Sequence, residues 1–328
     1  MRALVTGVGG QDGRYLVDRL LAEGTEVHGF AHEAEPRPDL PGVEVHLGDL
    51  TRHDDVRRLV LDVAPDEIYN LAAVSSVARS WQEPDLVAAV NGDAAVALLE
   101  TALQVQQRSG REVRFVQASS AEIFGEPGSE PQTERTPLRP VNPYGEAKAA
   151  AHRACATHRR RGLHAASLVL YSHESPRRPP GFVTRRITST VAAIARGEAD
   201  ELVLGNLEAR RDWGWAPDYV DAMVRAARAD RPDDFVVATG VAHSVRDFVA
   251  AAFRHAGVPD PEAHLRVDGS RLRPRDAGVQ VGDATRARTV LGWQPTVAFD
   301  ELVRRMVEAD LSEGGGAGRA GSRRTRSS

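Results

Sequence analysis

Tyr144 and Lys148 are four residues apart in the stretch VNPYGEAKAA, and Lys148 is the only lysine of the chain. Every other basic residue among the 42 lysines and arginines is an arginine. Residues four apart share one face of a helix, where a lysine ammonium favours the phenolate form of a neighbouring tyrosine. Such a tyrosine can take a proton from a substrate hydroxyl while a hydride leaves the same carbon. The pair therefore predicts a redox site, and the alternative is a surface i,i+4 pair without chemistry.

The segment SSAE, residues 119–122, follows the apolar run VRFVQA and supplies a second set of reactive groups. It comes at the end of a predicted strand, where open α/β sheets bind their ligands. The Ser120 hydroxyl is expected to hydrogen-bond a reacting oxygen, and the Glu122 carboxylate to remove a proton made acidic by a neighbouring ketone. The alternative is a helix-capping sequence, with serine as the cap and glutamate in the first turn.

Three glycines, Gly7, Gly10 and Gly13, lie between the first apolar run and the first amphipathic stretch. Glycine at this junction permits a tight turn and lets a pyrophosphate approach a helix N-terminus. The motif predicts a dinucleotide site, and because the sequence contains no GxxxxGK[ST], P-loop phosphoryl transfer is set aside. Asp49, after the third predicted strand, is expected either to meet the adenine or to cap the helix that follows.

Predicted strands and helices alternate through the first half of the chain. Short apolar runs separated by amphipathic stretches such as GRYLVDRLLAEG predict βαβ units and a parallel sheet. The predicted fold is α/β, a Rossmann-like doubly wound parallel sheet with a smaller C-terminal substrate-binding lobe. The dinucleotide-binding domain is expected to cover 1–170, with part of 214–240 returning to it. The lobe is expected to cover mainly 171–311, and a disordered tail 312–328.

Composition argues against several classes of protein. The net charge of −4 supplies no basic excess for a nucleic-acid partner. The single cysteine, Cys155, excludes an internal disulfide and a cysteine-rich zinc site, and no metal is expected. The sequence shows no apolar run that approaches membrane-spanning length, and it opens directly with a predicted strand, MRALVTG. We therefore expect a cytoplasmic protein with no membrane partner.

Taken together, the motifs resemble those of the GDP-mannose 4,6-dehydratases, which belong to the extended short-chain dehydrogenase/reductases. The resemblance runs from Met1 to about Asp310 and rests on these segments, in order: TGVGGQDGRYL, GDL, PDEIYNLAA, QASSAEIFG, NPYGEAK, HESPRR, FVTRRI, RRDWG, DYV and LGWQP. The first of them, HESPRR and RDWG are much more specific than a glycine motif or YxxxK alone.

The resemblance implies an internal redox cycle on a nucleotide-diphosphate sugar, GDP-mannose, with NADP as the cofactor and NAD as the alternative. It implies that Tyr144 deprotonates the C4 hydroxyl, with Lys148 beside it and Ser120 holding O4. Glu122 then removes the C5 proton, water leaves from C6, and the product is a 4-keto-6-deoxy sugar nucleotide.

The resemblance also implies which residues bind the two ligands. The implied cofactor residues are Gly7, Gly10, Gln11, Asp12, Gly13, Asp49, Leu50, Asn70, Leu71, Ala72, Tyr144, Lys148 and His173. The implied substrate residues are Ser75, Ser172, Glu174, Thr184, Arg185, Arg186, Arg211, Arg273 and Asp276. Arginines suit a diphosphate because a guanidinium donates hydrogen bonds in pairs.

The chain departs from the family pattern at several places. His32 and Glu33 stand where the family has two arginines, and much of the long loop that follows is missing. NAD and a homodimer therefore compete with the NADP and the homotetramer that the family implies. Ala121 replaces a hydroxyl residue of the family's STSE segment, so it has no hydroxyl to help the C6 leaving group.

Two other functions stay open from the sequence. A sugar-nucleotide 4-epimerase or 4-keto-reductase on the same scaffold would need Tyr144 and Lys148 but would have no use for Glu122 at C5. A non-catalytic nucleotide-sensing protein is the more distant alternative. The complete set of Ser120, Glu122, Tyr144 and Lys148 argues against it.

Overall fold

The computed structural model describes residues 1–271 and 278–316, and the chain divides into two compact units. The first unit comprises Met1–His173, Arg211–Ala242 and Arg273–Thr296, and the second comprises Glu174–Arg210, His243–Leu272 and Val297–Ser328. The sequence anticipated a return of the chain to the first unit within 214–240. The structure adds a further return, through 278–296, which the sequence did not indicate.

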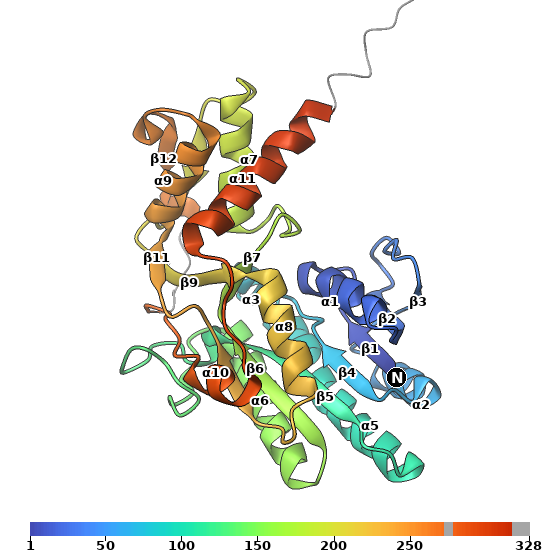
Figure 1. Ribbon diagram of the computed structural model, residues 1–328. Helices are drawn as coiled ribbons and strands as arrows, with labels where there is room; N and C mark the ends of the chain where they lie inside the picture. Colours follow the sequence, from blue (N-terminus) through green and yellow to red (C-terminus); the bar gives the residue numbers. More distant parts are fainter. Residues whose placement is uncertain (272–277, 317–328) are drawn as a thin grey trace, which may run out of the picture. The chain divides into compact units, whose positions relative to one another are not determined.

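A seven-stranded sheet forms the centre of the first unit (Figure 1). Its strands are β1 (Arg2–Thr6), β2 (Glu26–His32), β3 (Val43–Gly48), β4 (Glu67–Asn70), β5 (Arg114–Ser120), β6 (His164–Leu170) and β10 (Asp234–Val237). Their order is β10-β6-β5-β4-β1-β2-β3, and neighbouring strands run parallel. The order reverses between β1 and β4, which is the position where doubly wound sheets bind dinucleotides. The predicted Rossmann-like fold is confirmed.

Helices cover both faces of this sheet because successive residues of each strand point to opposite faces. One face packs against α1 (Gln11–Ala22), α8 (Ala216–Ala227) and α10 (Thr285–Leu291). The other face packs against α2 (His53–Val63), α5 (Ala94–Ser109) and α6 (Pro143–Arg160). In β1, for example, Ala3 and Val5 are buried on the first face and Leu4 on the second. Both cores are therefore built from strand residues that alternate along the chain.

A long helical run leads into α5. It begins with α4 (Pro84–Ala88), continues through the π-helical segment η1 (Ala89–Asp93), and ends with α5. By length and composition the run Pro84–Ser109 could cross a membrane, so the expectation that no apolar stretch approaches that length is wrong. More than half of its apolar window is buried within the protein, and α5 supplies buried residues to the core. Two short elements complete this part of the chain: α3 (Val77–Ser80) precedes the run, and the 3-10 turn η2 (Ala121–Ile123) follows β5.

Three helices form the body of the second unit: α7 (Val183–Ala195), α9 (Val245–Ala256) and α11 (Phe299–Gly316), each packed against the other two. The remaining elements of the unit are β8 (Leu202–Leu204), β12 (Leu265–Val267), η3 (Pro261–His264) and η4 (Gly269–Arg271). The strands β7 (Ser172–Glu174), β9 (Arg210–Trp215) and β11 (Ala242–Ser244) lie where the chain passes from one unit to the other. Because α11 continues to Gly316, the tail predicted to be disordered begins as helix over 312–316, and 317–328 lie outside the described residues.

Candidate active site

The glycine motif forms the turn between β1 and α1. Gly7 has a φ of +68°, and a Cβ there would lie 2.8 Å from the backbone nitrogen of Ala72. A Cβ on Gly13 would lie 2.4 Å from the Gly7 carbonyl oxygen. Gly10 is the N-cap of α1 and has no side chain to cover the helix N-terminus. The turn therefore brings bare backbone and a helix N-terminus to the sheet edge, an arrangement that fits a pyrophosphate.

Polar side chains join the carboxyl ends of β1 and β4 to the middle of β5. The Thr6 hydroxyl donates to Asn70 Oδ1 at 2.7 Å and accepts the backbone N–H groups of Leu71 and Ala72, each at 3.1 Å. The Asn70 amide in turn donates to Gln117 Oε1 at 2.9 Å. These bonds fix the start of the loop after β4, which borders the glycine turn through Ala72.

Tyr144 and Lys148 lie in the first turns of α6. The helix begins after Asn142, whose Oδ1 accepts the N–H of Gly145 at 2.8 Å, and has Pro143 in its first turn. The buried Lys148 ammonium donates to the Ala118 carbonyl at 2.8 Å and lies 5.9 Å from the centroid of the Tyr144 ring. The two side chains are therefore close on one side of the helix, as their spacing predicts.

Burial changes the acid-base behaviour of Lys148. Removal of the ammonium from water lowers its pKa to about 8, and the negative charge of Asp12 partly opposes this change. At neutral pH the ammonium is still mostly charged, yet it is poised to lose its proton within the physiological range. An arginine would keep its charge at any such pH.

The Glu122 carboxylate is buried and held by two neutral amides. Asn142 Nδ2 donates to its Oε2 at 2.8 Å, and Gln280 Nε2 donates to its Oε1 at 3.1 Å. Asn142 is also the residue that caps α6, so one side chain connects Glu122 to the start of the helix carrying Tyr144. Ser120, at the end of β5, accepts the N–H of Glu122 through its Oγ at 3.3 Å. The interpretation of SSAE as a capping sequence therefore fits its local geometry. The Glu122 carboxylate takes no part in the cap and is available for a second role.

Gln11, Asp12 and His173 form one hydrogen-bonded group. His173 Nε2 lies 2.8 Å from Asp12 Oδ2, and Gln11 donates to both the Asp12 carboxylate and the His173 carbonyl, each at 3.1 Å. The group connects the first turn of α1 to β7, the short strand that follows β6 and contains His173. The two motifs GQDG and HES therefore have a structural purpose beside any contact with a cofactor.

The carboxyl ends of β2 and β3 carry two acidic residues with different partners. Asp49 accepts the backbone N–H and the hydroxyl of Thr51, at 2.9 and 2.8 Å, which makes it a local turn residue before α2 and lowers its pKa. Glu33 accepts two hydrogen bonds from the Arg52 guanidinium, one at 2.8 Å. Leu50, the residue after Asp49, is buried in the core.

Residues 4–306 match the family model described as GDP-mannose 4,6 dehydratase. GDP-mannose 4,6 dehydratase 1 of Arabidopsis thaliana is 40% identical over 94% of this chain and 89% of its own length. The chain belongs to the GDP-mannose 4,6-dehydratase family. The Homo sapiens GDP-mannose 4,6 dehydratase is 39% identical over 94% of this chain and 91% of that enzyme. Among solved structures, the UDP-glucose 4-epimerase of Thermus thermophilus in complex with NAD superposes with a TM-score of 0.83 at 29% identity, covering 94% of this chain and 99% of the epimerase.

The substrate residues implied by the family fall in both units. In the first unit Ser75 is exposed, Ser172 is half-buried, and Arg211 is buried with its guanidinium 3.5 Å from the Gly278 carbonyl. Arg273 and Asp276 lie outside the described residues.

In the second unit, two of the family's substrate residues contact each other, and two more contact residues outside that set. Buried Glu174 accepts the Thr184 hydroxyl at 2.8 Å. Arg185 pairs with Asp310 at 2.7 Å and with Glu313 at 2.9 Å. Arg186 reaches the Gly181 carbonyl, at 3.5 Å. The roles of these residues toward a substrate stay predictions.

Sequence reasoning missed three residues that organise the family site. Asn142 was detectable in principle, because Asn-Pro before an amphipathic stretch is a helix-start sequence. Asn91, in η1, holds the loop after β4 by bonding both the N–H and the carbonyl of Val74, at 2.8 and 3.1 Å. Gln280 comes from the second return of the chain and has no local pattern that would reveal it.

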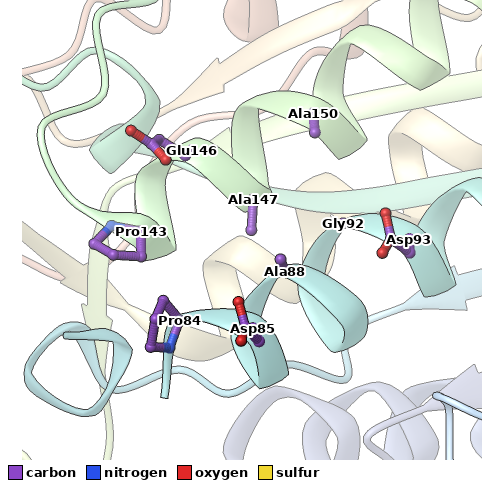
Figure 2. A pocket seen from close by; sticks show the side chains of 9 residues that line it. All are labelled: Pro84, Asp85, Ala88, Gly92, Asp93, Pro143, Glu146, Ala147 and Ala150. Atoms are coloured by element: carbon purple, nitrogen blue, oxygen red, sulfur yellow. The ribbon is translucent and has the colours of Figure 1, made fainter. Parts of the chain in front are cut away.

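The hollow drawn in Figure 2 is separate from this site. It has a volume of about 370 Å³ and lies between α6 and the segment 84–93. From α6 it is lined by Pro143, Glu146, Ala147 and Ala150, which occupy a different face of the helix from Tyr144 and Lys148. The predicted catalytic residues Ser120, Glu122, Tyr144 and Lys148 do not line this hollow.

Proposed function

We propose that the protein is a nucleotide-sugar 4,6-dehydratase that converts GDP-mannose to GDP-4-keto-6-deoxymannose and water through a bound nicotinamide cofactor. One observation carries the proposal. The side chain of Asn142 starts the helix that carries Tyr144 and Lys148, and it also holds the Glu122 carboxylate at 2.8 Å. A base for a hydroxyl, Tyr144, and a base for a carbon acid, Glu122, are thus connected through the side chain of one residue.

The first step is removal of the C4 hydroxyl proton by Tyr144. The nearby Lys148 ammonium favours the phenolate, and the Ser120 hydroxyl at the end of β5 would hold O4. When bound, the nicotinamide would accept a hydride from C4 and later return one to C6. The turn at Gly7, Gly10 and Gly13 would hold its pyrophosphate against the N-terminus of α1.

The second step is water loss. A ketone at C4 acidifies the C5 proton, Glu122 takes that proton, and Glu122 as the carboxylic acid then gives a proton to the C6 hydroxyl, which leaves as water. After a hydride returns to C6, a proton from solvent adds to C5. The amides of Asn142 and Gln280 fix the direction in which the carboxylate lone pairs point, and both are neutral donors. A 4-epimerase would have no use for a base held in this way.

The proposal is tested by incubating the purified protein with GDP-mannose in deuterated water. A dehydratase gives a 4-keto-6-deoxy product with deuterium at C5, visible by NMR and mass spectrometry, and Tyr144→Phe should give none. A C4 epimer without exchange at C5 would favour the epimerase alternative. If GDP-mannose gives neither product but another sugar nucleotide shows deuterium exchange, the reaction is the proposed one and the substrate is that other sugar nucleotide.

We propose that the cofactor is NADP, with Arg52 leaving Glu33 to bind the ribose 2′-phosphate. Arg52 would then take the role of the two arginines that the family has at the positions of His32 and Glu33. NAD would instead use the Glu33 carboxylate for its ribose hydroxyls. Mass spectrometry of the copurifying dinucleotide separates the two, and Arg52→Gln should weaken NADP binding about tenfold while leaving NAD binding unchanged. If NAD copurifies with the protein and Arg52→Gln does not change dinucleotide binding, the assignment of NADP is wrong.

We further propose a cytoplasmic homo-oligomer, a dimer or a tetramer. The short loop after His32 favours the dimer over the tetramer. Light scattering coupled to size-exclusion chromatography measures the oligomer directly, and fractionation of expressing cells measures the location.

A further inference from the structure

The tripeptide Glu-Val-His occurs twice in the first unit, at 26–28 and at 44–46, and the reaction proposed above uses neither copy. The first copy lies in β2 and the second in β3, the strand at the end of the sheet (Figure 1). In the register of this parallel pair His28 lies opposite Glu44, and Phe30 lies opposite His46. Residues two apart on a strand share a face, so both glutamates and both histidines point to the same side of the sheet.

Three ligand-type atoms from these side chains converge. His28 Nδ1 lies 3.1 Å from His46 Nε2 and 3.6 Å from Glu44 Oε2, and His46 Nε2 lies 3.8 Å from Glu44 Oε1. A tetrahedral zinc ion with bonds of about 2.0–2.1 Å holds its ligand atoms roughly 3.3 Å apart. The three observed separations are close to that value, so only small side-chain rotations are needed to enclose an ion.

Glu26 orients one of the two imidazoles. Its Oε1 lies 3.0 Å from His28 Nε2 and also accepts a hydrogen bond from Arg2 Nε at 2.9 Å. A carboxylate at this position keeps the proton of a neutral imidazole on Nε2, and the Nδ1 lone pair then points at His46 and Glu44. Metal-binding histidines are commonly held in this way, with the second ring nitrogen donating to a carboxylate.

We propose that His28, Glu44 and His46 bind one divalent transition-metal ion of the zinc type, with Glu26 as the positioning residue for His28. Two imidazoles and one carboxylate suit Zn²⁺, Ni²⁺ or Cu²⁺ and do not suit Mg²⁺ or Ca²⁺, which prefer oxygen ligands. The ion would join β3 to β2 and so protect the edge of the sheet, where unpaired backbone groups are exposed. It stands apart from the dehydratase chemistry, since its ligands precede the carboxyl ends of both strands.

The test is isothermal titration of the untagged full-length protein, stripped with EDTA and dialysed, with ZnCl₂ and separately with MgCl₂. We expect one Zn²⁺ per chain with a dissociation constant at or below the micromolar range, and no response to Mg²⁺. His46→Asn and Glu44→Gln should each weaken Zn²⁺ binding at least tenfold, whereas His53→Asn, at an exposed histidine of α2, should change nothing. Glu26→Ala should weaken it about tenfold and Glu26→Gln much less, because glutamine still accepts from Nε2.

Bound Co²⁺ gives an independent readout that a purely structural defect would not imitate. The wild type should show the visible absorption of a low-coordinate Co²⁺ site, and His46→Asn, checked for folding by circular dichroism, should lose it. Glu44 is exposed, so Glu44→Gln keeps the test valid if His46→Asn is unstable. Absence of Zn²⁺ binding tighter than millimolar, or full binding retained in the His46→Asn, Glu44→Gln double variant, would overturn the proposal.

Discussion

Two buried carboxylates, Glu122 in the first unit and Glu174 in the second, are held by different kinds of group. Glu122 accepts hydrogen bonds from the neutral amides of Asn142 and Gln280, at 2.8 and 3.1 Å. Glu174 accepts from the Arg178 guanidinium at 2.7 Å and from the Thr184 hydroxyl at 2.8 Å. Both residues belong to the site implied by the family, yet their surroundings give them different tasks.

The difference separates activity from stability. Loss of one partner of a buried ion pair leaves an unpaired charge, which costs several kcal/mol of folding free energy. When a carboxylate that is held by two neutral amides loses its charge, no cation is left unpaired in those two contacts. The change does remove the proton acceptor. Glu122 should therefore matter mainly to the reaction, and Glu174 mainly to the fold of the second unit.

The largest expected effect is on turnover in Glu122→Gln. Glutamine keeps the shape of the side chain but cannot take the C5 proton, so kcat should fall by about 10²–10⁴. The bound cofactor should still be reduced by GDP-mannose, which absorbance of the reduced nicotinamide measures, and the melting temperature should stay close to that of the wild type. Release of a 6-deoxy product at the normal rate would contradict the assignment of the base.

Lys148 supplies a cation near the reacting groups, and this cation lies beside Tyr144. Lys148→Arg should reduce kcat by about 10², because a planar guanidinium cannot occupy the place of the ammonium against the Ala118 carbonyl. In the wild type, kcat/KM should fall as the pH rises through about 8, because the ammonium has its charge below that pKa and loses it above. The residual activity of Lys148→Arg should lack this fall. An unchanged alkaline limb in the variant would assign the titration to another group.

Glu174→Gln is the matched change in the second unit. It removes the charge that the half-buried Arg178 guanidinium faces at 2.7 Å, so the free energy of unfolding should fall by about 3 kcal/mol, measured by urea titration. Turnover per folded molecule should stay within a few-fold of the wild type at low temperature. A collapse of activity without loss of stability would show that Glu174 touches the substrate, as the family resemblance implies, and the contrast with Glu122 would fail.

The sequence could predict the parts of the site that depend on neighbours along the chain. Helical spacing alone places Tyr144 and Lys148 on one face, and the glycine turn follows from a strand and a helix that are adjacent in sequence. Gln280 could not be predicted, because it reaches Glu122 across 158 residues through a return of the chain that no periodicity marks. The pairing of Glu33 with Arg52 depends in the same way on which strands become neighbours.

The smallest expected effect tests the orienting amides themselves. Gln280→Ala removes one donor to Glu122 without touching a helix cap, so kcat should fall about tenfold while the free energy of unfolding changes by about 1 kcal/mol or less. Asn142→Ala removes the other donor together with the N-cap of α6, and should cost about 1 kcal/mol more in stability as well as activity. If positioning of the carboxylate is what these amides supply, both variants should lower kcat at nearly constant KM. A loss expressed only in KM would mean that the amides bind the sugar, and Glu122 would then owe its orientation to its own backbone in η2.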